Sequence, residues 1–356
     1  MTRAKRPVRA RLTVAEPSEP PSRWSSAVAA VADGTTQIAV GGVLMATFGG
    51  EVTKCFVTGE VGGRWWFLAL AIAGLAILLF GVWQRVTAGS RTQTGIVAAL
   101  TGPRGGHARI RQLEQRADKV SKSLCEYTLK VNVDLEPDSA GERGVLDDFA
   151  DKTAEGSAWV QWAAPDATAI NLFPAMAENV AFVFGAKISD YPFAREVVVH
   201  EIGPGGTSAS VPLLSPRTFD SEETSHYGRV RPLETGDLTR VAIAVDLHGA
   251  GDQYFDQVKA TCRRDGIGLL LMITPPPALR NGSASALAGV VDLVCREWQG
   301  ASLNENARTG QHAIFLGGSL SMAVALGARL AARDHGRWIA YAQDPAGNTY
   351  EAFPSV

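Results

Sequence analysis

Two turns between predicted strands and helices contain the residues best placed to bind an anionic ligand. The turns are Phe173-Pro174-Ala175-Met176 and Leu316-Gly317-Gly318-Ser319, and each follows a short apolar run and precedes a helical one. The backbone amides at the start of a helix have no partner within the helix, and they attract negative charge. These turns therefore predict an anion site built largely from main-chain donors.

Charged and aromatic side chains could complete such a site. Arginine pairs with phosphate oxygens, and aromatic rings stack on nucleobases. The candidates are Arg195, Arg217, Arg229, Arg231, Arg240, Arg280 and Arg337, with Trp159, Trp162, Tyr341 and Tyr350. Core packing is the competing interpretation for Trp159 and Tyr341. We expect the ligand to be bound by Phe173, Pro174, Ala175, Asn179, Arg195, Asp246, His248, Arg280, Gly317, Gly318, Ser319 and Tyr350.

The sequence offers little support for catalysis. It contains no GxSxG, GxxxxGK[ST] or HExxH motif, and Gly203 to Thr207 follows a strand without the helix that a phosphate-binding loop needs. The four cysteines are far apart, which disfavours both zinc and a disulfide framework. We expect no catalytic residue, metal or cofactor. Two alternatives stay open, a membrane-anchored hydrolase or nucleotide-degrading sensor, and a membrane-tethered scaffold for other proteins.

The elements that position these residues alternate between strands and helices from about Gly144 onward. This alternation predicts an α/β domain with a mostly parallel sheet. Helical stripes occur around Met176 to Phe184 and around Leu287 to Trp298. The expected strands are Ser157–Trp162, Ala169–Phe173, Glu196–Ile202, Arg240–Asp246, Gly268–Thr274, His312–Leu316 and Arg337–Gln343.

A repeat appears when the chain is shifted by 142 positions. Ile170 to Gly205 then lies over His312 to Gly347 without a gap. Six positions are identical, and both copies read strand, tight turn, helix with AxxxGA, and strand ending in a glycine turn. A duplication of this kind would place the two turns around one shared, pseudo-symmetric cavity, because ligands bind beyond the carboxyl ends of parallel strands.

The N-terminal quarter differs in composition from the rest. Trp65 to Trp83 (WWFLALAIAGLAILLFGVW) has no charge and would span roughly 28 Å as a helix, close to a bilayer core. A second apolar stretch, Gln37 to Gly50, is shorter. Basic residues precede Gln37 and follow Trp83, and only Lys54 and Arg64 lie between the two stretches. This pattern favours a hairpin of two spans, about 36–55 and 65–84, over a single span.

The resulting organisation has four parts. A basic cytoplasmic tail occupies 1–34, the transmembrane hairpin 35–84, a juxtamembrane linker and helix 85–143, and a soluble domain 144–356 with halves of about 144–235 and 236–356. The helix from Ala108 to Thr128 is either a stalk or a solvated helix packed on its own domain. The net charge of −2 argues against a DNA-binding coat.

The C-terminal stretch IFLGGSLSMAVALGARLAARDHGRWIAYAQDPAGNTYEAF resembles the closing segment of SAVED domains, the sensors of bacterial cyclic-oligonucleotide anti-phage systems (CBASS). The run VAIAVDLHG, Val241 to Gly249, looks like the start of the second half in that family. The matching features are the strand Ala313–Leu316, the turn Gly317–Ser319, the helix positions Ala323, Gly327 and Leu330, the strand Trp338–Ala342, and Asp344, Gly347 and Tyr350. The resemblance covers roughly Gly144 to Val356.

The resemblance implies a domain of two fused CARF-like (Rossmann-like) halves. It implies a cyclic di-, tri- or tetranucleotide ligand made by a CD-NTase-type cyclase. With helices in front, the chain looks like the transmembrane SAVED class of effector, a multi-pass protein of the bacterial inner membrane with its sensor in the cytoplasm. The implied action is homo-oligomerisation on ligand binding, followed by disruption of the lipid bilayer and growth arrest.

Overall fold

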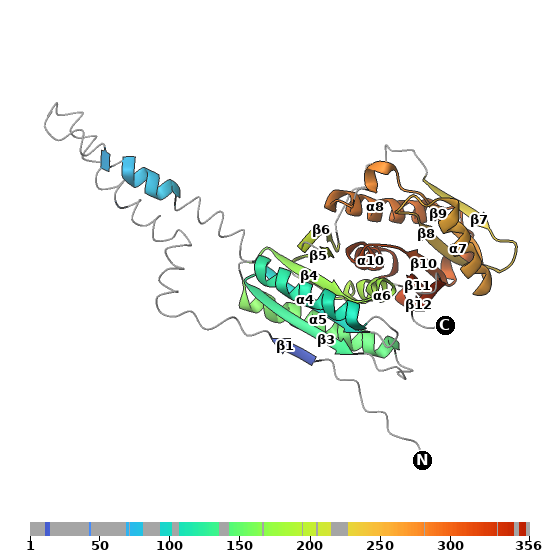
Figure 1. Ribbon diagram of the computed structural model, residues 1–356, viewed down its shortest axis with the longest axis horizontal. Coiled ribbons are helices and arrows are strands. Elements are labelled where there is room, and N and C mark those ends of the chain that lie inside the picture. Colours follow the sequence, from blue (N-terminus) through green and yellow to red (C-terminus); the bar gives the residue numbers. More distant parts are fainter. Residues whose placement is uncertain are drawn as a thin grey trace, which may run out of the picture. The chain divides into compact units, whose positions relative to one another are not determined.

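The computed structural model describes residues 11–14, 43, 69–70, 72–80, 93–101, 107–134, 142–165, 167–193, 195–203, 206–214, 227–280, 282–332, 334–344 and 349–353. The chain divides into two compact units. One comprises Met1–Ala15 with Thr94–Val356, and the other is Glu16–Gln93. The larger unit contains two six-stranded sheets, which define the first and second lobes (Figure 1).

The first lobe is built on a sheet with strand order β1-β3-β2-β4-β5-β6. Its four inner strands are parallel, and the two edge strands β1 and β6 are antiparallel to their neighbours. Its elements are β1 (Arg11–Val14), β2 (Thr94–Thr101), α4 (His107–Leu124), β3 (Tyr127–Asp134), α5 (Glu142–Ala163), β4 (Ala169–Ala175), α6 (Glu178–Ile188), β5 (Glu196–Gly203) and β6 (Gly206–Pro212).

The second lobe repeats this plan, with strand order β7-β9-β8-β10-β11-β12. The inner strands are again parallel and the edge strands β7 and β12 antiparallel. Its elements are β7 (Gly228–Pro232), β8 (Asp237–Val245), α7 (Asp252–Arg264), β9 (Ile267–Ile273), η1 (Pro277–Leu279), α8 (Ala284–Gly300), α9 (Glu305–Thr309), β10 (His312–Leu316), α10 (Leu320–Leu326), η2 (Gly327–Ala331), η3 (His335–Arg337), β11 (Trp338–Asp344) and β12 (Thr349–Phe353).

The two lobes match strand for strand, which confirms the predicted duplication and extends it. The offset of 142 relates the starts of α5 and α8 (Glu142 and Ala284), of α6 and α10, and of β5 and β11. The repeat therefore begins before Gly144. The predicted halves 144–235 and 236–356 are wrong in this respect, because β2, α4 and β3 belong to the first lobe and do not form a linker.

The packing corrects one further expectation and decides between the two alternatives for another. Ser157 to Trp162 is part of α5, because Phe149, Thr153 and Val160 recur at helical spacing on its buried face. The helix expected at 108–128 exists as α4 but contacts β2 and β4, so it packs on its own domain and is not a stalk. Strand β2, TGIVAALT, is buried throughout, as expected of a central parallel strand.

One continuous hydrophobic core joins the lobes. It includes Ile96 of β2, Phe149 of α5, Ile243 of β8 and Val291 of α8, all with 1% exposure or less. Helix α4 covers the opposite face of the first sheet and α7 the opposite face of the second, each over a smaller core. Helices α5, α6, α8 and α10 therefore lie between the sheets, as Figure 1 shows.

The lobes meet where α6 crosses α10. A Cβ on Gly185 of α6 would lie 2.0 Å from the carbonyl oxygen of Val324, and one on Gly327 would lie 1.8 Å from that of Phe182. These four residues form two pairs related by the offset of 142, so the contact is reciprocal about a pseudo-two-fold axis. Only glycine allows this backbone approach.

The predicted transmembrane hairpin falls mostly outside the described residues. Residues 69–70 and 72–80 are helical, and Ile72, Leu79 and Phe80 expose more than 49% of their surface. Within the part of the chain that the structure describes, no helix combines the length and apolar character needed to cross a membrane. Most of the predicted basic tail 1–34 is likewise not described, but Arg11–Val14 pairs with β3 as an edge strand and does not belong to a tail.

Candidate functional site

The start of α6 and the predicted turn at Gly317–Ser319 come together at the boundary between the lobes. The carboxylate of Glu178, at the start of α6, accepts a hydrogen bond of 3.1 Å from the amide of Gly318. The side-chain amide of Asn179 donates to the carbonyl oxygen of Glu351 in β12 at 3.1 Å. The second turn follows β10 as predicted, but Phe173, Pro174 and Ala175 of the first predicted turn are the last residues of β4. It is therefore the start of α6 that meets the other lobe across the pseudo-two-fold axis.

A second carboxylate, that of Glu201 in β5, binds the beginning of α10. Its Oε2 accepts hydrogen bonds from the Ser319 hydroxyl and the Ser321 amide, each 2.9 Å long. The Ser319 hydroxyl in turn accepts from the Met322 amide and caps the helix. Main-chain donors expected to meet an anionic ligand are therefore occupied by carboxylates of the other lobe.

The loop after β8 forms the neighbouring wall of the site. The buried carboxylate of Asp246 accepts from the amides of Ala250 at 3.0 Å and Gly251 at 2.8 Å, and so fixes the loop before α7. Gly318 has a φ of 110°, and a Cβ there would lie 3.1 Å from Cε1 of His248. The exposed imidazole of His248 thus lies against the Gly318 turn.

Arg280 lies on the far side of the same loop. A Cβ on Gly249, whose φ is 70°, would lie 2.5 Å from a terminal guanidinium nitrogen of Arg280. The Nε of Arg280 donates to the carbonyl oxygen of Pro275 at 2.7 Å, which fixes the side chain. The terminal nitrogens of this half-buried residue lie over the loop. This wall of the site thus contains one guanidinium and one imidazole.

Glu178 has the most perturbed environment among the groups of the site. Burial raises the pKa of its carboxyl group, and the Glu201 carboxylate raises it further. The Gly318 amide, Arg109 and His248 act in the opposite direction. The interaction with Arg109 places the N-terminal end of α4 near the same site. We define the interlobe crevice by Arg109, Glu178, Glu201, His248, Arg280 and the turn Gly317–Ser319.

Several predicted ligand contacts belong to the core. Phe173 and Ala175 have no exposed surface, and Pro174 is buried within β4. Phe173 stacks on His200 with ring centroids 4.7 Å apart, and burial lowers the pKa of His200 to about 4. Phe315 stacks on Tyr341 at 4.6 Å in the same way. Each phenylalanine stacks on a ring of the next parallel strand, although His200 and Tyr341 are not themselves related by the offset of 142, and neither phenylalanine ring is available to a ligand.

Tyr350 is intermediate between core and site. It is 4% exposed and packs edge-on against Phe315, and burial raises its pKa to about 12. The Glu178 carboxylate contributes to this rise, so Tyr350 supports the floor of the crevice beside Glu178. Asn179, Asp246 and Ser319 are likewise buried and shape the crevice through their hydrogen bonds.

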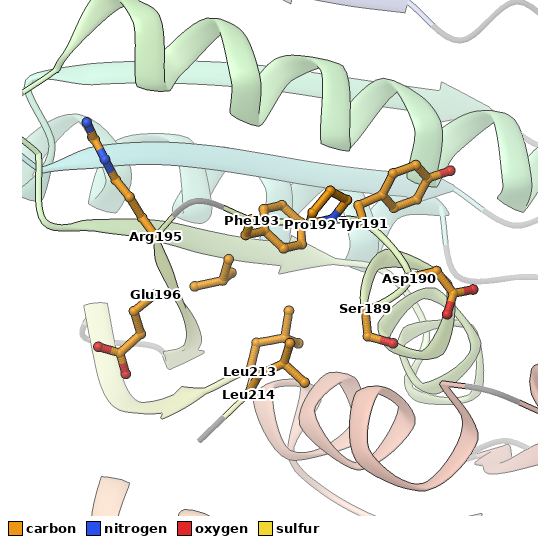
Figure 2. Close-up of a pocket in the computed structure, with 10 residues that line it drawn as sticks. Ser189, Asp190, Tyr191, Pro192, Phe193, Arg195, Glu196, Leu213 and Leu214 are labelled. Carbon is orange, nitrogen blue, oxygen red and sulfur yellow. The ribbon is translucent and has the colours of Figure 1, made fainter. Parts of the chain in front are cut away.

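Most of the predicted arginines lie elsewhere. Arg195 donates to the carbonyl oxygens of Ala164 and Pro165, just after α5, at the amino end of β5. In Figure 2 its side chain extends away from the apolar residues of a hollow of about 690 Å³ lined by Tyr191, Phe193 and Leu213 among others. Because Arg195 and Arg337 precede parallel strands, they lie at the edge opposite the crevice.

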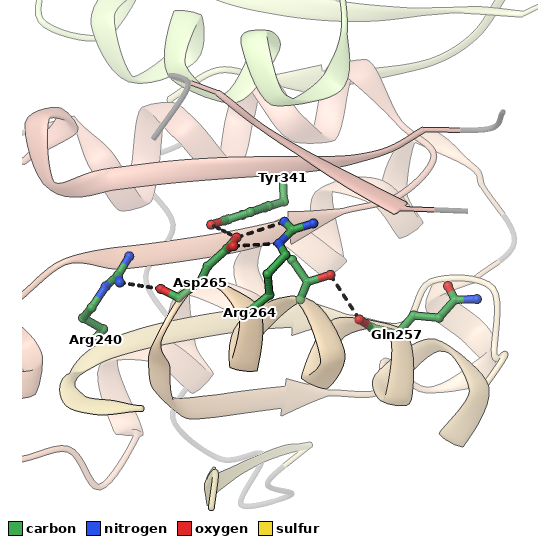
Figure 3. Close-up of polar contacts among 6 residues, drawn as sticks. Arg240, Gln257, Arg264, Asp265 and Tyr341 are labelled. Carbon is green, nitrogen blue, oxygen red and sulfur yellow. Dashed lines mark hydrogen bonds and ion pairs between the residues drawn. The ribbon is translucent and has the colours of Figure 1, made fainter. Parts of the chain in front are cut away.

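Arg240 and Tyr341 belong to a polar cluster at that same opposite edge (Figure 3). The Tyr341 hydroxyl donates to the Asp265 carboxylate at 2.8 Å, and Arg240 donates to the Asp265 carbonyl oxygen. Arg264 also pairs with Asp265. Arg229 and Arg231 lie on edge strand β7 and line a hollow of about 380 Å³ together with Gly251 of the loop before α7. Arg217 lies outside the described residues. Among the described arginines of the predicted set, Arg280 is the one placed at the crevice by its contact with the loop after β8.

Three residues of the crevice escaped prediction from the sequence. Arg109 lies in the helix expected at 108–128, whose sequence indicates a stalk or a solvated helix and not a part of the site. Glu178 is the first residue of a helix, where an acid is common for reasons unrelated to ligands. Glu201 interrupts the apolar sequence of β5, and a charged residue near the carboxyl end of such a strand is the signal that could have identified it.

The crevice combines anion-binding and hydrogen-bond-accepting groups. Arg109, Arg280 and His248 can pair with phosphate oxygens. The carboxylates of Glu178 and Glu201 can accept hydrogen bonds from the amino groups of a base. Such a set suits a ligand with both phosphates and base edges.

No protein-family model and no curated protein matches the chain. Among solved structures, it is similar to the Acinetobacter baumannii Cap4 SAVED/CARF-domain containing receptor. The complex with the cyclic trinucleotide 3′3′3′-cAAA has 12% identity and a TM-score of 0.38, covering 91% of this chain and 77% of that chain. The complex with 2′3′3′-cAAA has 12% identity and a TM-score of 0.37, covering 89% and 76%.

Proposed function

We propose that this chain is a membrane-bound effector of bacterial anti-phage signalling, whose duplicated α/β domain is a SAVED-type sensor of a cyclic oligonucleotide. The observation that carries the proposal is the interlobe hydrogen bond between Glu178 and Gly318. It joins the switch-point turns of two equivalent lobes in one crevice, the place where open parallel sheets bind ligands. The sequence resemblance of the C-terminal half to SAVED domains supports the same conclusion.

A cyclic oligonucleotide fits the chemistry of the crevice. Each phosphodiester carries a negative charge, for which Arg109, His248 and Arg280 are partners of suitable type. The bases carry amino groups, from which the carboxylates of Glu178 or Glu201 can accept hydrogen bonds. A pseudo-two-fold arrangement of loops also suits a ring-shaped ligand with repeated units.

Ligand binding would act on the contact between the lobes. The carboxylates of Glu178 and Glu201 hold main-chain amides of Gly318 and Ser321 across the boundary. A phosphate that takes these amides must displace the carboxylates and break the interlobe bonds. The lobes would then repack about the α6–α10 crossing, since packed interfaces switch between discrete arrangements.

The effector action belongs to the apolar N-terminal segment. We propose that the ligand-bound sensor domains assemble and bring together segments inserted in the inner membrane, so that the bilayer is disrupted. The uncharged run from Trp65 to Trp83 supports the membrane attachment. The sensor domain would lie in the cytoplasm, where the cyclase product is made.

The test is a calorimetric titration of the full-length protein in detergent with cyclic di-, tri- and tetranucleotides. We expect one ring size to bind, and Arg280→Ala to weaken it about tenfold or more through loss of a charge-assisted contact. Arg195→Ala is the matched control, because Arg195 binds carbonyl groups at the opposite edge.

Two results would contradict the proposal. One is a failure of every cyclic nucleotide to bind, which would favour a protein scaffold. The other is equal weakening by Arg195→Ala and Arg280→Ala. Mass spectrometry of the recovered ligand separates a receptor from a nucleotide-degrading sensor, since only the latter returns linear product.

A further inference from the structure

The duplication locates the point at which the first lobe is interrupted. In the second lobe, β7 ends at Pro232 and β8 begins at Asp237, so Leu233 to Gly236 is a short connection. The equivalent connection in the first lobe joins β1, which ends at Val14, to β2, which begins at Thr94. The unit Glu16–Gln93 is therefore an insertion within the first lobe and does not simply precede it.

Both ends of this insertion leave the same edge of the first sheet. Val14 pairs with Leu129 of β3, and Thr94 pairs with Tyr127 of the same strand. This edge contains the amino ends of the parallel strands, and we call it the amino edge of the first lobe. The interlobe crevice lies at the other end of the strands, roughly 25 Å away for the eight residues of β2.

Large apolar side chains are exposed where helices reach the amino edge. Trp162, the penultimate residue of α5, is 79% exposed, and Trp159 one turn earlier is 40% exposed. Leu124, the last residue of α4, is also 40% exposed. The offset of 142 places Ala301 and Asn304 at the positions of the two tryptophans, so the second lobe has no such pair.

The end of α4 that reaches this edge is basic. Arg116, Lys119 and Lys122 are exposed on its last three turns, and Lys122 pairs with Asp118 at 3.1 Å. Tryptophan and basic side chains together are typical of protein surfaces that contact the headgroup region of anionic membranes.

We propose that the amino edge of the first lobe is a lipid-facing surface, with Trp159 and Trp162 in the headgroup region and the basic end of α4 beside them. The inference rests on the proposed membrane attachment. Lipid is favoured over a protein partner because the chain leaves this edge at Val14 and returns to it at Thr94, and the segment between them contains the apolar run Trp65 to Trp83. Since both ends are fixed to one folded lobe, the insertion crosses the bilayer an even number of times.

The test measures how close two positions of α5 come to lipid in the full-length protein. A fluorophore is attached to Trp162→Cys or to Asp148→Cys in a Cys55→Ser background. Asp148 is exposed near the other end of the same helix, about 21 Å away. Cys125, Cys262 and Cys295 are buried, and burial raises their thiol pKa values to about 11, 12 and 12, so they resist labelling.

The labelled proteins are reconstituted in phosphatidylcholine–phosphatidylserine vesicles containing a lipid with a nitroxide near the headgroup. We expect the emission at position 162 to fall about twofold or more, and that at 148 to stay unchanged. Equal emission at both positions in vesicles that float with the protein would overturn the proposed surface while membrane attachment stands. Failure to float with the vesicles would refute the attachment as well.

One further outcome separates lipid from protein contact. If the label at position 162 is shielded from aqueous iodide but unaffected by the nitroxide lipid, this edge packs against protein, and the proposal is wrong.

Discussion

At the scale of single residues, the crevice is governed by which groups hold the amides of the second turn. These partners are the Glu178 and Glu201 carboxylates, which come from the other lobe. In the proposed function, a ligand phosphate would compete with these two anions for the same amides, so the charge of each carboxylate would affect the affinity.

Replacing Glu178 by Gln should therefore strengthen binding of a cyclic oligonucleotide. The amide oxygen can still accept from Gly318, while one negative charge is removed beside the ligand phosphates. We expect a gain of about three- to tenfold at neutral pH, the size of one screened charge interaction. Calorimetry on the full-length protein measures it, and unchanged or weaker binding would contradict the competition.

The pH dependence follows from the raised pKa of Glu178. Burial and Glu201 favour its neutral form, so the carboxyl group gains its proton above the ordinary value of 4.5 as the pH falls. Binding of the polyanion should strengthen over this range in the wild type and much less in Glu178→Gln. Both are compared in a His248→Asn background, which removes the imidazole that lies against Gly318. Equal pH profiles would exclude Glu178 as the cause.

Residue-level prediction from the sequence placed the second turn at Gly317–Ser319, but it read the end of β4 as a turn and assigned most of the arginines to the wrong edge. Gly317, Gly318 and Ser319 were identified because small residues between a strand and a helix have few other uses. Arg195 was misassigned because a basic residue just before a parallel strand lies at its amino end, away from the ligand edge. Phe173 is part of an apolar strand that is buried on both faces, so its ring was never available.

At the scale of elements, the α6–α10 crossing fixes how the lobes are joined. Gly185 and Gly327 have no side chain, so the backbones of the two helices can approach closely at these two positions. Their identity in the repeat, together with Ala181/Ala323 and Ala186/Ala328, was visible in the sequence. Its meaning was not, because a helical AxxxGA pattern does not say which helix it contacts.

The glycine crossing gives a direct prediction for stability. Gly185→Ala places a Cβ 2.0 Å from the Val324 carbonyl oxygen, so the helices must separate. We expect a loss of about 1–3 kcal/mol in the free energy of unfolding, measured by urea denaturation. Gly144→Ala in α5 is the control, because nothing lies within 4 Å of its added Cβ. That variant should be unchanged or stabilised by up to about 1 kcal/mol, and a similar loss in both would contradict the crossing.

Element boundaries were predicted best where apolar runs were bounded by turns. His312–Leu316 was obtained as the structure has it, and β4, β5, β8, β9 and β11 were found within a few residues. Strand β2 was missed because glycine, alanine and threonine make up most of it, so it read as a linker. Residues 157–162 were read as a strand from their aromatic content, although the helical spacing of buried positions decides the structure.

At the scale of the whole molecule, the chain is a duplicated domain interrupted by an apolar insertion. Sequence analysis placed that segment in front of the sensor, because the four residues of β1 carry too little pattern to be recognised. The structure makes Arg11–Val14 the counterpart of β7 and so closes the first sheet. A short edge strand far along the chain from its sheet is invisible to any local pattern.

Removing the insertion should therefore leave a working sensor. A chain in which Val14 is joined to Thr94 through the four residues Leu233 to Gly236 copies the connection of the second lobe. We expect this protein to be recovered without detergent and to bind ligand as the full chain does. A protein that starts at Gln93 lacks β1, so the edge of β3 is exposed. We expect this protein to aggregate or to unfold at a lower urea concentration. If the two proteins behave alike, β1 is not an integral strand.

The central claim is that a cyclic oligonucleotide binds in the interlobe crevice. It is tested most directly by irradiating the full-length protein with a photoreactive azido derivative of the ring that binds, then mapping the modified peptides by mass spectrometry. The account predicts modification within 246–251, 278–280 and 317–322, and its loss with excess unlabelled ligand. Modification confined to 189–197 and 213–214, which line the hollow at the opposite edge of the first lobe, would contradict it.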